Sequence, residues 1–167
     1  VAAGCGAAGG RCALGPRVES LNLSANEAEL RPETRVVALL GADRSVRQLS
    51  LADTPRLGAR GAARLSQVLA TNTTLTSLDV GGCRLAADGA GAADASGVLR
   101  LAAALKHNAT LTELQLARNG LCRDGAREAL QAVLGAVAAH PSLVHLNLED
   151  NDIDELAGAL GFEQLPT

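Results

Sequence analysis

The stretch Leu75-Thr-Ser-Leu78-Asp-Val80-Gly-Gly-Cys83 decides the fold, because its pattern recurs along the chain. Two variable residues separate the first aliphatic residue from the second, and one separates the second from the third. The copies begin at Val18, Val46, Leu75, Leu111 and Leu143, which lie 28, 29, 36 and 32 residues apart. Self-similarity at a spacing of about 20–50 residues is the signature of a repeat architecture.

Each copy predicts a short strand followed by a turn. Successive side chains of a strand point to opposite faces, so Leu21 and Leu23 face inward and Asn22 faces outward. Eight residues after each start stands a small residue that can hydrogen-bond: Asn26, Thr54, Cys83, Asn119 and Asn151. A turn leaves backbone groups that neighbouring strands cannot reach, and we expect the asparagines to satisfy them. Thr54 and Cys83 should do so less well.

Helical spacing of apolar residues follows the turns. It predicts helices from Pro32, over about 58–70, around 101–105, over about 124–139, and for two turns at most after Ile153. Residues 89–97 lengthen the third repeat, either by about two helical turns or by a small convex loop. Arg56, Arg60 and Arg64 are four residues apart and would line one face of the second helix, which we interpret as a solvated flank.

This pattern resembles the leucine-rich repeat, and its period resembles the ribonuclease-inhibitor-like class of that family. The resemblance covers about residues 18–160 and implies an α/β solenoid of about five repeats. It places a parallel sheet on the concave face and helices on the convex face. We expect two segments, a Gly/Ala-rich flexible lead or degraded repeat edge at 1–17 and the repeat domain at 18–167. Each inward Leu or Val would contribute roughly 1.5–3 kcal/mol once a neighbouring repeat covers it.

The composition excludes several classes of function. The 167 residues are 47% apolar with a net charge of −3, which fits one globular domain. The single aromatic residue, Phe162, rules out an aromatic cage or a base-stacking platform. No stretch approaches about 18 consecutive apolar residues, and no signal peptide is recognisable, so we expect a cytoplasmic protein. The start without Met suggests an excerpt of a longer chain.

No motif specifies catalysis, a cofactor or a metal. Gly4, Gly6 and Gly9 have the spacing of a dinucleotide-binding loop but lack the strand that must precede it. The residues Asp150, Asp152 and Asp154 have the spacing of the first ligands of a calcium loop, but Glu155 and Gly161 do not fit the rest of that loop.

The cysteines Cys5, Cys12, Cys83 and Cys122 form no C-x-x-C pair. His107 and His140 fall near helix ends, where an imidazolium would complement the helix dipole. Asn72 and Asn108 match glycosylation sequons, but their shared place before a repeat start indicates a structural role at the end of a helix.

The outward strand positions and the following turns form the predicted binding surface. It is small, polar and mixed in charge, which suits a protein partner better than a small ligand, a nucleic acid or a membrane. The candidate residues are Asn22, Ser50, Asp79, Glu113, Gln115, Arg118, His145, Asn147, Glu149 and Asp150.

The predicted function is a non-enzymatic protein-interaction scaffold in a cytoskeletal or ciliary assembly. Within the resemblance, a unit of five repeats is also similar to the C-terminal domain of tropomodulin, which implies binding at the end of an actin filament. A GTPase-activating domain of the Ran-activator type is a further alternative. The residues do not name the partner, the binding face or the oligomeric state.

Overall fold

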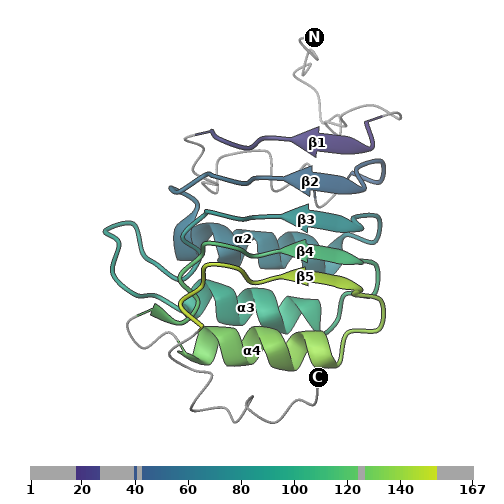
Figure 1. Cartoon of the computed structure of the whole chain (residues 1–167). Helices are drawn as coiled ribbons and strands as arrows, with labels where there is room; N and C mark the ends of the chain where they lie inside the picture. The colour runs from purple at the N-terminus through teal and green to yellow at the C-terminus, as the bar shows by residue number, and fades with distance from the viewer. Residues whose placement is uncertain (1–17, 27–39, 41–42, 124–126, 154–167) are drawn as a thin grey trace.

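A computed structural model shows one parallel sheet backed by helices (Figure 1). It describes residues 18–26, 40, 43–123 and 127–153. The strands are β1 (Ser20–Asn22), β2 (Gln48–Ser50), β3 (Ser77–Asp79), β4 (Glu113–Gln115) and β5 (His145–Asn147). The helices are α2 (Gly58–Thr71), α3 (Ser96–Leu105) and α4 (Arg127–Ala138).

The strands pair in chain order and in the register that the repeat predicts. Leu21, Leu49, Leu78, Leu114 and Leu146 are direct partners across the sheet. A slip of one residue would turn every inward leucine outward, so the match between spacing and register confirms the solenoid. The fold is the predicted α/β leucine-rich repeat architecture, with the sheet on the concave side and the helices on the convex side.

The core lies between the sheet and the helices. The central strand leucines Leu49, Leu78 and Leu114 are at most 1% exposed. The helices contribute the apolar faces that their spacing predicts, such as Leu65, Val68 and Leu69 of α2. At the two ends of the sheet Leu21 and Leu146 are only partly buried, because each has one neighbouring strand instead of two among the described residues.

Helices α2 and α3 approach each other closely at Gly97. A Cβ atom at this position would collide with the backbone carbonyl of Ala59. Gly97 follows the first residue of α3, and Ala59 follows the first residue of α2. The missing side chain therefore sets the distance between two adjacent helices.

Most predicted elements agree with the structure, and two expectations need refinement. Helix α2 begins at Gly58, so Arg56 lies in the preceding turn and does not continue the stripe of Arg60 and Arg64. The extra residues of the third repeat form a turn and loop before α3, with a bridge between Ala87 and Ala93. The expectations for 1–17, for the helix from Pro32 and for the end after Ile153 lie outside the described residues.

None of the helices within the described ranges is long and apolar enough to cross a membrane.

Candidate protein-binding surface

Asn119 and Asn151 close the turn after their strands. The Asn119 Nδ2 atom donates to the carbonyls of Val80 and Leu116, both at 2.9 Å, and its Oδ1 atom accepts the N–H of Cys83 at 3.1 Å. Asn151 repeats this arrangement one repeat later, with its Oδ1 accepting the N–H of Asn119 at 3.0 Å. The predicted asparagine column therefore exists, and it links neighbouring repeats.

Thr54 and Cys83 occupy the position of these asparagines in their own repeats, and their side chains make fewer hydrogen bonds. The Thr54 hydroxyl donates to the Ala52 carbonyl at 3.4 Å, and the Cys83 thiol donates to the Leu51 carbonyl at 3.0 Å. Burial raises the pKa of the Cys83 thiol to about 11. The cysteine is thus a structural hydrogen-bonding residue and not a nucleophile at neutral pH.

A second column stands three residues before each repeat start. The Oδ1 atom of Asn72 accepts the N–H groups of Thr74 and Leu75, both at 2.8 Å, and its Nδ2 donates to the Leu40 carbonyl at 2.8 Å. Asn108 does the same one repeat later. Both asparagines are 4% exposed, which confirms a structural role at these sequons.

His140 occupies this column in the last described repeat. Its Nδ1 atom accepts the N–H groups of Ser142 and Leu143 at 3.3 and 3.1 Å, so the ring proton resides on Nε2. Burial lowers the pKa of His140 below its ordinary value of 6.5. The expected imidazolium at a helix end is therefore wrong, because an acceptor at Nδ1 requires the neutral ring.

The sheet face opposite the helices, which we call the open face, carries the candidate residues on the strands. These outward residues are exposed or half-buried, while the leucines between them are turned into the core. The candidate residues on the open face are Asn22, Ser50, Asp79, Glu113, Gln115, His145 and Asn147. Arg118, Glu149 and Asp150 lie beyond the strands in the turns, where all three are exposed.

Hydrogen bonds join open-face residues within a strand and across repeats. The Ser77 hydroxyl donates to Glu113 Oε2 at 2.9 Å, and Gln115 Nε2 donates to Glu113 Oε1 at 3.0 Å. These two bonds lower the pKa of the Glu113 carboxyl, and the bond from Gln115 has the larger effect. On the neighbouring column the Ser50 hydroxyl donates to Asp79 Oδ2 at 3.2 Å. The face is therefore pre-ordered and carries the carboxylates of Asp79 and Glu113 near its centre.

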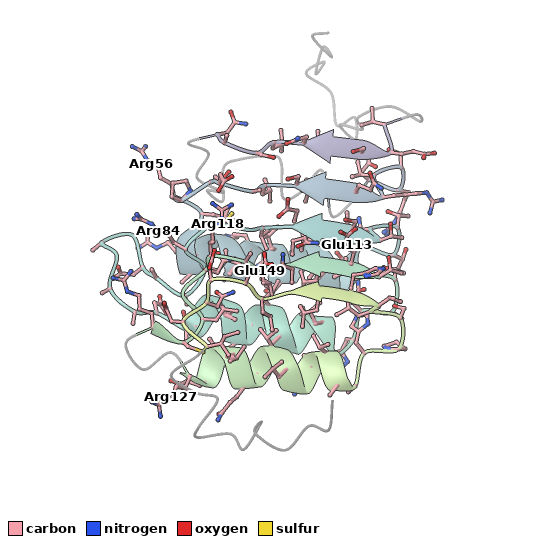
Figure 2. The ribbon with its side chains drawn as sticks, in the orientation of Figure 1. Arg56, Arg84, Glu113, Arg118, Arg127 and Glu149 are labelled. Carbon is pink, nitrogen blue, oxygen red and sulfur yellow. The ribbon has the colours of Figure 1, made fainter. Side chains whose placement is uncertain are left out.

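Arg118 reaches across one repeat to Asp53. Its Nη2 atom lies 3.0 Å from Asp53 Oδ1, and both side chains are about half exposed. The intervening turn carries Gly82, whose Cβ would collide with the Asp53 carboxylate. Figure 2 shows Arg118, Arg84 and Arg56 on the turn side of the sheet. The candidate residue Arg118 can thus reach Asp53 because Gly82, between them, has no side chain.

Sequence reasoning missed a cleft at this turn side. It has a volume of about 340 Å³, and it is lined by Arg118 and Asp150 together with Arg84, Arg123 and Asp152. Its residues come from turns at which several backbone φ angles are positive, including Arg84 at 54° and Gly120 at 66°. The repeat pattern could have located these turns, but not the direction of their side chains.

Within the described part of the chain, no group of three or more His, Cys, Asp or Glu side chains could hold a metal ion. The arrangement offers hydrogen bonds, charges and a cleft, which are means of recognition.

Three repeats match a known family model. The model is described as a leucine-rich repeat, and it matches residues 71–92, 107–128 and 139–155. Together with the in-register strands, this decides the family. The chain is a leucine-rich repeat protein.

Solved structures show the same fold for this leucine-rich repeat chain. A structure of leiomodin-1 actin-binding site 2 has 19% sequence identity and a TM-score of 0.61, covering 89% of this chain and 88% of its own. The tropomodulin C-terminal domain of Caenorhabditis elegans has 16% identity and a TM-score of 0.60, covering 87% and 85%. No curated protein sequence matches the chain.

Proposed function

We propose that this leucine-rich repeat domain is a protein-interaction scaffold whose partner docks on the open face. The observation that carries the proposal is a five-stranded sheet with one face packed on helices and a polar, partly exposed opposite face. Leucine-rich repeats use such extended concave surfaces for binding. The ordered Ser77–Glu113–Gln115 cluster supports the proposal further, because pre-ordered side chains lose little entropy when a partner binds.

Charge reversal tests this proposal. A partner would first be captured from native extract and purified, and its affinity for the intact chain then measured. We expect Glu113→Lys together with Arg118→Glu to weaken binding by at least about tenfold. The reason is that charges on the open face and in the adjoining turns determine the electrostatic complementarity to the partner. The matched control is Arg60→Glu with Arg64→Glu on α2, which should leave the affinity unchanged.

A further variant tests whether Arg118 acts through contact with the partner or through its ion pair with Asp53. Asp53→Ser removes the ion pair and keeps the positive charge of Arg118. If this variant binds as weakly as the Arg118 variant, the effect arises from the lost ion pair. If only the α2 variant lost binding, the partner would bind the helices and not the open face.

Actin is the second candidate partner. The support is the likeness, over most of both chains, to leiomodin-1 actin-binding site 2 and to the tropomodulin C-terminal domain. An end-binding domain of this kind would associate the protein with the cytoskeleton. No residue of the described segments adds support for the GTPase-activating alternative, which accelerated GTP hydrolysis by Ran would detect.

Filament assays distinguish actin from other partners. The intact chain should co-sediment with filaments or slow elongation at the pointed end if actin is the partner. The Glu113→Lys and Arg118→Glu double variant should lose this effect, and the α2 variant should keep it. Elongation that is unchanged at saturating protein, with no co-sedimentation, would eliminate actin while leaving the scaffold proposal intact.

A further inference from the structure

Two chemically different groups of residues line the cleft at the turn side. The first group, which we call the small wall, consists of small residues of the third repeat: Ala86, Ala87, Gly91 and Ala93. The second group, which we call the charged side, consists of charged residues from three successive turns: Arg84, Arg118, Arg123, Asp150 and Asp152. A cavity of about 340 Å³ falls within the size range of ligand sites, which is about 300–1,000 Å³.

The small wall exists because of the residues that lengthen the third repeat. Asp88 organises this loop, since its Oδ1 atom accepts the N–H groups of Ala90 and Ala92, both at 2.9 Å. The Asp94 N–H donates to the Ala86 carbonyl at 2.9 Å and closes the base of the loop. Alanine has a single methyl group and glycine has no side chain, so these residues leave room for the cleft.

The charged side is divided between repeats. The three guanidinium groups come from the third and fourth repeats, and the two carboxylates come from the fifth. The bridge to Asp53 orients Arg118 and uses only part of its hydrogen-bonding capacity, because a guanidinium has five N–H donors. Arg84 stands at a positive φ of 54°, a conformation that is strained for a residue with a side chain.

We propose that this cleft binds a carboxylate group of a protein partner, most simply a glutamate side chain of an extended segment. Arginine forms bidentate bonds with carboxylates, and the alanine wall fits the methylene groups of a glutamate. A phosphate has no methylene groups to contact the small wall, so it would use only the charged side of the cleft. The inference adds the partner's chemistry to the proposed function and rests on it, but Arg84 and Arg123 are not part of the open face.

A peptide titration tests the cleft without any natural partner. The probe is a short peptide with blocked ends and two glutamates, titrated into the isotope-labelled full chain and followed by amide chemical shifts. We expect shifts at Gly91, Ala93, Gly120 and Arg123, and none at the amides of β2. Arg84→Glu with Arg123→Glu should weaken binding at least about tenfold, because two charge-assisted contacts become repulsive.

Matched probes and variants decide the chemistry. The same peptide with glutamine should not bind, and a peptide with a free C-terminus and no glutamate tests whether a terminal carboxylate suffices. Arg60→Glu with Arg64→Glu is the control for net charge and should bind the glutamate peptide normally. Equal binding of the glutamine or a lysine peptide would overturn the proposal, as would tighter binding of inorganic phosphate at equal ionic strength. The open-face variant Glu113→Lys should leave the peptide affinity unchanged, so failure here is distinct from failure of the scaffold proposal.

Discussion

One side chain in each turn satisfies backbone groups that the strands and helices leave unpaired. Asn119 makes bonds to carbonyls of its own repeat and of the previous repeat, and it also accepts N–H groups from that repeat. Buried backbone groups without partners are costly, so a turn of this shape requires an amide that both donates and accepts. This explains why the column favours asparagine, and why Thr54 and Cys83 are weaker substitutes.

Asn119→Ala should destabilise the fold strongly. The substitution leaves the carbonyls of Val80 and Leu116 and the N–H groups of Cys83 and Leu85 with lost partners, and we expect a loss of about 3 kcal/mol or more. Urea denaturation measures the free energy of unfolding. The control is Asn22→Ala on the open face, where the amide is exposed and a change of about 0.5 kcal/mol is expected. Equal losses for both would refute the structural role of the column.

His140 should make stability depend on pH. The folded state lowers the pKa of this residue by burial, so the unfolded chain binds the proton more tightly. The contribution of the neutral ring is therefore present above the unfolded pKa of about 6.5, and it is lost as the pH falls through the folded pKa. The measurement is the free energy of unfolding between about pH 5 and 8, compared with that of His140→Asn.

His140→Asn is informative because the chain already uses Asn at this place. Among the described side chains, His140 Nε2 is the buried polar atom without a hydrogen-bond partner. In Asn72 and Asn108 the corresponding amide donates to carbonyls of the preceding repeat. We expect the variant to be more stable by about 1 kcal/mol at neutral pH and to lose part of the pH dependence. A variant with an unchanged pH profile would show that other groups cause the dependence.

At the scale of elements, glycines have opposite effects in adjacent helices. Gly97→Ala should destabilise the fold by about 1–3 kcal/mol, because the new Cβ meets the Ala59 carbonyl and the helices must move apart. Gly135→Ala in α4 is the control, since a Cβ added there would have no heavy atom within 4 Å from the described residues outside its own stretch of helix. It should stabilise the fold by about 1 kcal/mol through helix propensity. Thermal unfolding would measure both, and stabilisation by Gly97→Ala would contradict the close approach.

The sequence predicts those elements in which one periodicity dominates. The aliphatic triplet predicts the strands and their register, because only one face of each strand can be buried. The helical spacing of Leu65, Val68 and Leu69 locates α2 to within one residue. The loop at 87–95 could not be distinguished from extra helical turns, because alanine fits both and the decisive Asp88 bonds are local tertiary contacts.

Part of the candidate surface could likewise be predicted from the periodicity, and part could not. Strand alternation alone places Asp79, Glu113 and Gln115 on the open face, and the structure shows them there. The bridge from Arg118 to Asp53 depends on the absent side chain of Gly82, and the cleft depends on the path of an unusual loop. Contacts between turns of different repeats are set by backbone angles, which a one-dimensional pattern does not contain.

At the scale of the whole molecule, each repeat is stabilised by its neighbours. The inward leucines of the central strands are sealed by a strand on each side, whereas Leu21 at the edge is partly exposed. Stability in such an array is approximately a sum of repeat terms and nearest-neighbour interface terms. A destabilising substitution in a central repeat therefore weakens the interfaces with two neighbouring repeats. The same substitution in an edge repeat weakens one interface.

Leu114→Ala and Leu21→Ala test this sharing of stability. Leu114 is 0% exposed and lies between β3 and β5, so its truncation should cost about 2–5 kcal/mol and lower the protection of amides in both neighbouring strands. Leu21→Ala should cost about half as much and reduce protection mainly in β1 and β2. Denaturation with site-resolved hydrogen exchange measures both quantities. If both variants reduced protection uniformly over all the strands, the chain would unfold as one block, and the nearest-neighbour description would not hold for it.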